Sequence, residues 1–154
     1  MKKQDTGAET LFNQSVRSTL VFQGEDFLLP SESQYREVLQ HIQDHTYYAN
    51  TSIPKTLSFE EGVYSWYEEI YEPIMRAVDK LGLLYHISGS TRGELYLWIS
   101  RHWHFLKERT GKNLHPKFAV LDFGRRFSTS WLSRFRYALG LAWIKLDPSR
   151  ASYL

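Results

Sequence analysis

The chain has 154 residues, 42% of them hydrophobic and 16% aromatic, with a formal net charge of +2. This length is enough to bury a core without disulfides, and the absence of cysteine excludes disulfides, thiolate chemistry and cysteine-ligated zinc. No run of about 18 apolar residues predicts a membrane-spanning helix, and no apolar run follows Lys2 and Lys3 as in a secretory signal, so we expect a cytoplasmic protein.

The first 16 residues are polar and aperiodic, so we predict a mobile N-terminal arm over residues 1–16. Residues 19–22 and 27–29 are rich in β-forming side chains around a turn, which predicts a short β hairpin. An isolated hairpin is marginal in water, so it has to pack on helices or pair with another chain. We expect a single helical domain over residues 17–147 and a C-terminal tail over residues 148–154.

The strongest helical signals lie at residues 58–81 and 91–109. Each segment opens with a Ser/Thr-x-x-Glu capping box, in which a hydroxyl and a carboxylate bind free backbone N–H groups. Each stops at a glycine, Gly82 or Gly111, which adopts the left-handed conformation common at helix ends. Pro73 removes one backbone hydrogen bond, so a kink or break is predicted near residues 71–72.

Three further helices are predicted over residues 31–50, 116–123 and 128–146. The side chains of the last helix that are expected to face the core are Trp131, Leu132, Phe135, Leu139, Ala142, Trp143 and Leu146. The predicted fold class is mainly α, with about five helices in a compact bundle and a short N-terminal β hairpin.

Histidines are the first candidates for chemistry. His41 and His45 lie four residues apart on one predicted helix, and His102 lies on the apolar side of another. Together with Glu68 or Glu69 they could supply imidazole and carboxylate ligands to a divalent metal. Because the pair lacks the glutamate of the H-E-x-x-H pattern, the signal is weakly specific. We expect no cofactor and keep a divalent metal site as an alternative to core-edge histidines bonded to a tyrosine or a carboxylate.

Carboxylates and aromatic rings are the next candidates. The glutamates of residues 60–72 could form a general acid through paired carboxylates, but they mostly avoid the apolar stripe, so a solvated face is favoured. We assign no catalytic residue. The rings expected on a contact surface, because aromatic residues with a polar edge are favoured at interfaces, are Trp66, Tyr67, Tyr71 and Trp103. Their alternative place is the core.

Charge is divided along the chain. Residues 1–100 hold 8 Lys and Arg against 14 Asp and Glu, a net of −6, and residues 101–154 hold 11 against 3, a net of +8. This asymmetry indicates an acidic partner or docking of one part of the chain on the other. The cations of the basic end are Arg125, Arg126, Arg134, Arg136 and Lys145. The segment predicts, in order of preference, a core helix with a solvated face, a helix on an anionic membrane surface, or a nucleic-acid-binding surface.

Three motifs carry a resemblance to a known family. The chain reads His-Ile-Gln-Asp-His-Thr-Tyr at residues 41–47, Trp-Tyr-Glu-Glu-Ile-Tyr-Glu-Pro at residues 66–73, and Glu-Leu-Tyr-Leu-Trp at residues 94–98. In this order they resemble the His-Ile-x-x-His-x-Tyr, Trp-Tyr-x-x-x-Tyr-x-Pro and Asp-Leu-Tyr-Leu-Trp motifs of an uncharacterised family of small bacterial proteins. The resemblance covers about residues 31–125 and implies a helical fold, without an activity. This chain has Ser90 where the family has arginine.

The leading hypothesis for function is a non-catalytic protein-interaction or regulatory module, because the chain has excess rings and a polarised charge without a recognisable active site. Homo-oligomerisation stays open. One alternative is a metal-binding protein or enzyme with a His/Glu site between helices. The other is a peripheral membrane protein that binds through its basic C-terminal helix.

Overall fold

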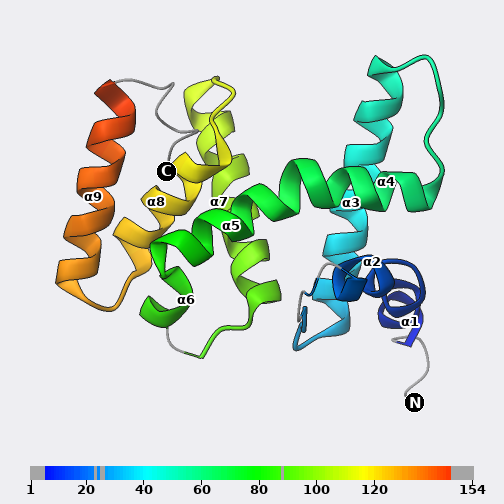
Figure 1. Ribbon diagram of the computed structural model, residues 1–154, viewed down its shortest axis with the longest axis horizontal. Helices are drawn as coiled ribbons and strands as arrows, with labels where there is room; N and C mark the ends of the chain where they lie inside the picture. Colours follow the sequence, from blue (N-terminus) through cyan, green and yellow to red (C-terminus); the bar gives the residue numbers. More distant parts are fainter. Residues whose placement is uncertain (1–5, 23, 25–26, 88, 147–154) are drawn as a thin grey trace. The chain divides into compact units, whose positions relative to one another are not determined.

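The computed structural model describes residues 6–22, 24, 27–87 and 89–146 (Figure 1). Every regular element in these residues is a helix and none is a strand, which confirms the mainly α fold. The predicted β hairpin is wrong. The chain divides into two compact units, residues 1–71 and residues 72–154. The single domain over residues 17–147 stays a prediction, and the predicted tail lies outside the described residues.

The helices of the first unit are α1 (Thr6–Ser15), α2 (Arg17–Phe22), α3 (Glu32–Ser52), α4 (Phe59–Trp66) and the π-helix η1 (Tyr67–Tyr71). Phe12, Val16 and Leu20 recur every four residues and are fully buried, because this spacing places side chains on one side of a helix. The ring of Phe12 lies 5.3 Å from that of Phe27 and 5.0 Å from that of Tyr35 on α3, between centroids.

These contacts correct two predictions. Residues 6–15, which were predicted as part of a mobile arm over residues 1–16, form a helix that packs on α3. Residues 1–5 of that predicted arm lie outside the described residues. Residues 17–22 are helical instead of forming the first strand of a hairpin. The β-forming side chains of this segment were misleading because Leu20 continues the four-residue spacing of α1, and tertiary burial outweighs local strand propensity.

The junction at Pro73 contains the predicted irregularity. Ser58 and Glu61 form the capping box that opens α4, as predicted. The helix then widens into η1 just before α5 (Glu72–Leu81) begins. Because Pro73 has no N–H and its ring crowds the preceding turn, a regular α-helix cannot pass this point unchanged, and a π turn is one way to accommodate it.

In the second unit, α5 is followed by α6 (Leu83–His86), α7 (Arg92–Thr110), α8 (Pro116–Phe127) and α9 (Trp131–Leu146). Thr91 and Glu94 form the capping box of α7, and Gly82 and Gly111 have φ of 64° and 63°, as predicted for the two glycine stops. In the parts of the chain that the structure describes, no helix combines the length and apolar character needed to cross a membrane.

Helices α8 and α9 lie side by side (Figure 1). They approach closely because each presents a glycine to the other. A Cβ on Gly124 would lie 2.8 Å from ring carbons of Tyr137, and a Cβ on Gly140 would lie 3.0 Å from a methyl of Leu121. The hydroxyl of Tyr137 donates to the carbonyl of Leu81 at 3.2 Å, so the same ring also fixes α9 to the end of α5.

Candidate functional site

His45 lies in a small polar cluster of the first unit. Its Nε2 is 2.8 Å from Oγ of Ser65 and 3.8 Å from Oε2 of Glu69, and the Ser65 hydroxyl lies 3.5 Å from Glu69 Oε1. Burial lowers the pKa of His45, and the Glu69 carboxylate acts against that shift. In a Ser-His-Asp triad the carboxylate holds Nδ1 while Nε2 takes the serine proton. Here the serine and the carboxylate both face Nε2, so the three side chains do not have the arrangement of a catalytic triad.

The other members of the predicted metal set have different surroundings. His41 is half-buried one turn before His45 on α3. Glu68 is exposed and hydrogen-bonds the Tyr64 hydroxyl, which raises the pKa of Tyr64. His102 pairs with Asp122 in the second unit. Within the described ranges, no three His, Asp or Glu side chains converge where they could hold a metal ion.

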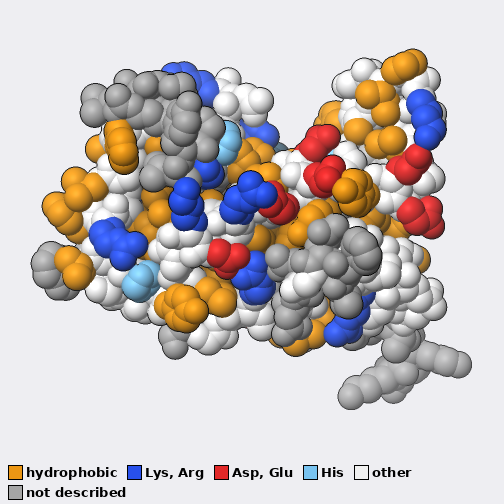
Figure 2. Space-filling model, viewed as in Figure 1, with side chains coloured by type: hydrophobic (Ala, Val, Ile, Leu, Met, Phe, Trp, Pro, Cys, Tyr) orange, Lys and Arg blue, Asp and Glu red, His pale blue; other side chains and the backbone are white. Residues whose placement is uncertain are grey.

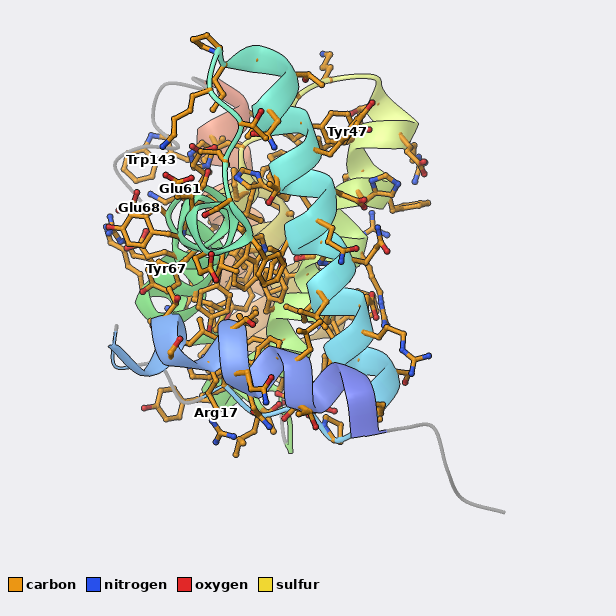
Figure 3. The ribbon with its side chains drawn as sticks, turned by 90° about the vertical axis from the view of Figure 1, so that its right-hand side faces the viewer. Arg17, Tyr47, Glu61, Tyr67, Glu68 and Trp143 are labelled. Atoms are coloured by element: carbon orange, nitrogen blue, oxygen red, sulfur yellow. The ribbon has the colours of Figure 1, made fainter. Side chains whose placement is uncertain are left out.

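The glutamates of α4 and η1 are mostly solvated. Glu60, Glu61, Glu68 and Glu69 are exposed, and Figure 3 shows Glu61 and Glu68 projecting beside the helix that contains α4. Glu61 is held by Lys55 at 2.7 Å and by the Ser58 backbone N–H at 2.8 Å, which lowers its pKa. The contact with Ser58 belongs to the capping box of α4, and the exposure of all four glutamates supports the solvated-face interpretation.

Three predicted contact residues are core residues instead. Trp66 and Tyr71 are fully buried and Tyr67 is nearly so. The ring of Tyr71 lies 5.3 Å from that of Trp66 and 5.6 Å from that of Tyr67, so the rings bury one another. Trp103 is half-buried, with its indole N–H donating to the carbonyl of Leu114 at 2.8 Å. An aromatic count does not reveal which rings are buried, because burial depends on which helix face packs against the rest of the unit.

A cluster around Asp122 joins α7 to α8. His102 Nε2 and Arg126 Nε lie 2.8 and 2.7 Å from Oδ2, and an Nη of Arg125 donates to Oδ1 at 2.8 Å. Burial alone would raise the pKa of Asp122, but the hydrogen bonds from Arg125, His102 and Arg126 outweigh it and hold that pKa below its usual value. Asp122 was not among the residues predicted from sequence, although it lies three and four residues before a pair of arginines.

Helix α9 is turned the opposite way from the prediction. Its buried side chains are Ser133, Tyr137, Leu141 and Ile144, whereas Leu132, Phe135, Leu139 and Trp143 are each 52–56% exposed. Ala142 is exposed as well, and the side chains of Trp131 and Leu146 lie outside the described part of the chain. We call Leu132, Phe135, Leu139 and Trp143 the outer face of α9. Figure 2 shows hydrophobic side chains along the edge of the molecule formed by α9, with Lys and Arg side chains beside them.

Helix α9 also carries three cations, Arg134, Arg136 and Lys145, and acidic residues are absent from residues 123–146 of the sequence. Arg134 donates to the backbone carbonyl of Ser128 at 2.7 Å, and the Lys145 ammonium lies 5.9 Å from the ring centroid of Phe118. Neither contact neutralises the positive charge. Of the predicted basic surface, Arg134, Arg136 and Lys145 lie on the same helix as the outer face, whereas Arg125 and Arg126 lie on α8 and pair with Asp122.

The chain matches no protein-family model, none of the curated proteins searched and no solved structure. The resemblance based on the three motifs stays a prediction.

Proposed function

We propose that this protein is a non-catalytic interaction module that binds its target through the outer face of α9. One observation carries the proposal: four large apolar side chains stand in a line, each more than half exposed, on a helix whose opposite face is buried. A helix that is apolar on both sides is normally enclosed on both sides. Single exposed apolar residues are ordinary on protein surfaces, but a contiguous line of them marks a contact surface.

The apolar side chains of the outer face of α9 are by themselves sufficient only for weak binding. Completing the burial of four half-exposed side chains contributes on the order of 3–6 kcal/mol, before the cost of association is subtracted. A millimolar dissociation constant corresponds to about 4 kcal/mol. The charged residues beside the outer face must therefore add to affinity and select the target.

Site-specific photocrosslinking tests the proposal. The photoreactive residue p-benzoylphenylalanine replaces Leu139 in the full chain, and a matched variant carries it at Tyr85, which is 89% exposed on α6. We expect adducts in cells, to protein or to lipid, from position 139 and few from position 85. Adding Phe135→Ser to the first variant should reduce its adducts severalfold. Equal yields at the two positions, or none at 139, would reject the proposal.

A further inference from the structure

We infer that the target of the outer face of α9 is an anionic lipid membrane, an inference that rests on the proposed function. The helix would lie in the plane of the lipid headgroups, with its outer face toward the acyl chains. Such interfacial helices combine Trp, Phe and Leu on one face with Lys and Arg on the rest of the helix. The outer face of α9 contains these three apolar residue types.

The arrangement of cations fits a flat anionic surface. At 3.6 residues per turn, Arg136 lies about 60° from Leu139 on one side of the outer face, and Arg134 and Lys145 lie about 120–140° away on the other. The long side chain of Arg136 can reach headgroup phosphates while its stem covers apolar surface. Arg134 and Lys145, which contact Ser128 and Phe118, add to the positive charge of the helix. The line from Leu132 to Trp143 is about 16 Å long, which suits a helix lying on the membrane.

The charge balance of the surroundings is positive. Residues 123–146 contain five Lys and Arg and no Asp or Glu, and residues 72–154 contain 14 against 6, a net of +8. In the sequence this segment is bordered by Asp122 and Asp147. Asp122 is buried and faces two arginines and a histidine. An anionic leaflet attracts such a segment over roughly a Debye length, about 8 Å at physiological salt.

Two other occupants fit less well. A second copy of the chain would place the three cations of one α9 helix against the three of another, which like-charge repulsion disfavours. A protein partner would need an apolar groove to receive an outward-facing helix surface, together with acidic rims on both sides. An anionic bilayer provides an apolar layer for the outer face of α9 and negatively charged headgroups for the cations, and it needs no preformed groove.

Fluorescence of a single label can test this inference directly. The chain has no cysteine, so Leu139→Cys in the full chain creates one thiol for an environment-sensitive fluorophore, and Tyr85→Cys provides the matched control. We expect a blue shift of the label at 139 with vesicles of phosphatidylcholine containing about 30% phosphatidylserine, an anionic lipid. We expect no shift with phosphatidylcholine alone, and none at position 85 with either vesicle.

Vesicle flotation of the unlabelled chain gives the second measurement. Flotation with the anionic vesicles should fall severalfold on raising the salt to about 0.5 M, because salt screens the attraction. It should also fall about tenfold in a Phe135→Ser, Leu139→Ser double variant and in an Arg136→Gln, Lys145→Gln double variant, whose substitutions are at exposed positions. Far-UV circular dichroism checks that both remain folded.

The outcomes separate the inference from the proposed function. No flotation and no blue shift, while crosslinking at position 139 still yields protein adducts, overturns the membrane inference and leaves the interaction module standing. Equal flotation with neutral and anionic vesicles also overturns it, because charge then plays no part. If crosslinking fails as well, both proposals fall.

Discussion

Nε2 of His102 lies 2.8 Å from Oδ2 of Asp122, and this contact ties the middle of α7 to the middle of α8. Both side chains are about nine-tenths buried. A buried carboxylate of this kind is stabilising only while its hydrogen-bond donors remain. The pair therefore stabilises the packing of α7 against α8 in the second unit.

Asp122→Asn should lower the free energy of unfolding by about 2–3 kcal/mol, because the substitution removes the charge that three donors share. Urea denaturation measures the change. Glu108→Gln is the matched control, since Glu108 forms an exposed ion pair with His104 at 3.1 Å, and it should change stability by less than about 0.5 kcal/mol. Equal effects of the two substitutions would show that Asp122 is not a structural anchor.

His45 should make stability depend on pH. Its pKa in the folded protein is below the usual 6.5 because burial disfavours the charged form. The unfolded chain therefore binds the proton more readily, and the contribution of His45, complete at neutral pH, is lost as the pH falls through 6.5 toward the folded pKa. Urea denaturation at several pH values should give a shallower decline for His45→Asn than for the wild type between about pH 7 and 5. Parallel curves would contradict this assignment.

Gly62→Ala should destabilise the first unit by about 1–3 kcal/mol, because the new methyl would overlap Oγ1 of Thr46 and lie 2.9 Å from its Cγ2. Thr46→Ala removes both atoms, so adding it to Gly62→Ala should cost less than the sum of the two single changes. The control is Gly7→Ala on α1, where a Cβ would have no neighbour within 4 Å. A strictly additive double variant would show that Gly62 and Thr46 do not compete for space.

Leu139 and Leu141 test the orientation of α9. Leu141→Ala should cost about 2–4 kcal/mol, since this side chain is buried, whereas Leu139→Ala should cost less than about 1 kcal/mol. Thermal unfolding of the two variants gives the comparison without any knowledge of a partner. A larger destabilisation by Leu139→Ala than by Leu141→Ala would show that α9 buries the side that the sequence pattern assigned to the core.

Features set by neighbouring residues were predictable from sequence. Ser58 with Glu61 and Thr91 with Glu94 form hydrogen bonds within a single helical turn, so their capping boxes needed no knowledge of the tertiary fold. The irregular turn before Pro73 was predictable for the same reason, because the missing N–H is a local property.

Features set by packing were not. Both sides of α9 are apolar, and the choice between Leu139 and Leu141 depends on the close fit of α9 to α8, which no periodicity reveals. The partners of the histidines are equally distant in sequence: Ser65 lies 20 residues after His45, and Asp122 lies 20 after His102. These pairs meet only because two helices cross at those positions.

The ring of Tyr137 occupies the space that a side chain at position 124 would need. The sizes of the residues at these two positions are therefore coupled. In chains descended from the same ancestor, a larger residue at the glycine should be accompanied by a smaller one at the tyrosine. Covariation of these two positions would identify this helix crossing even in sequences that have otherwise diverged.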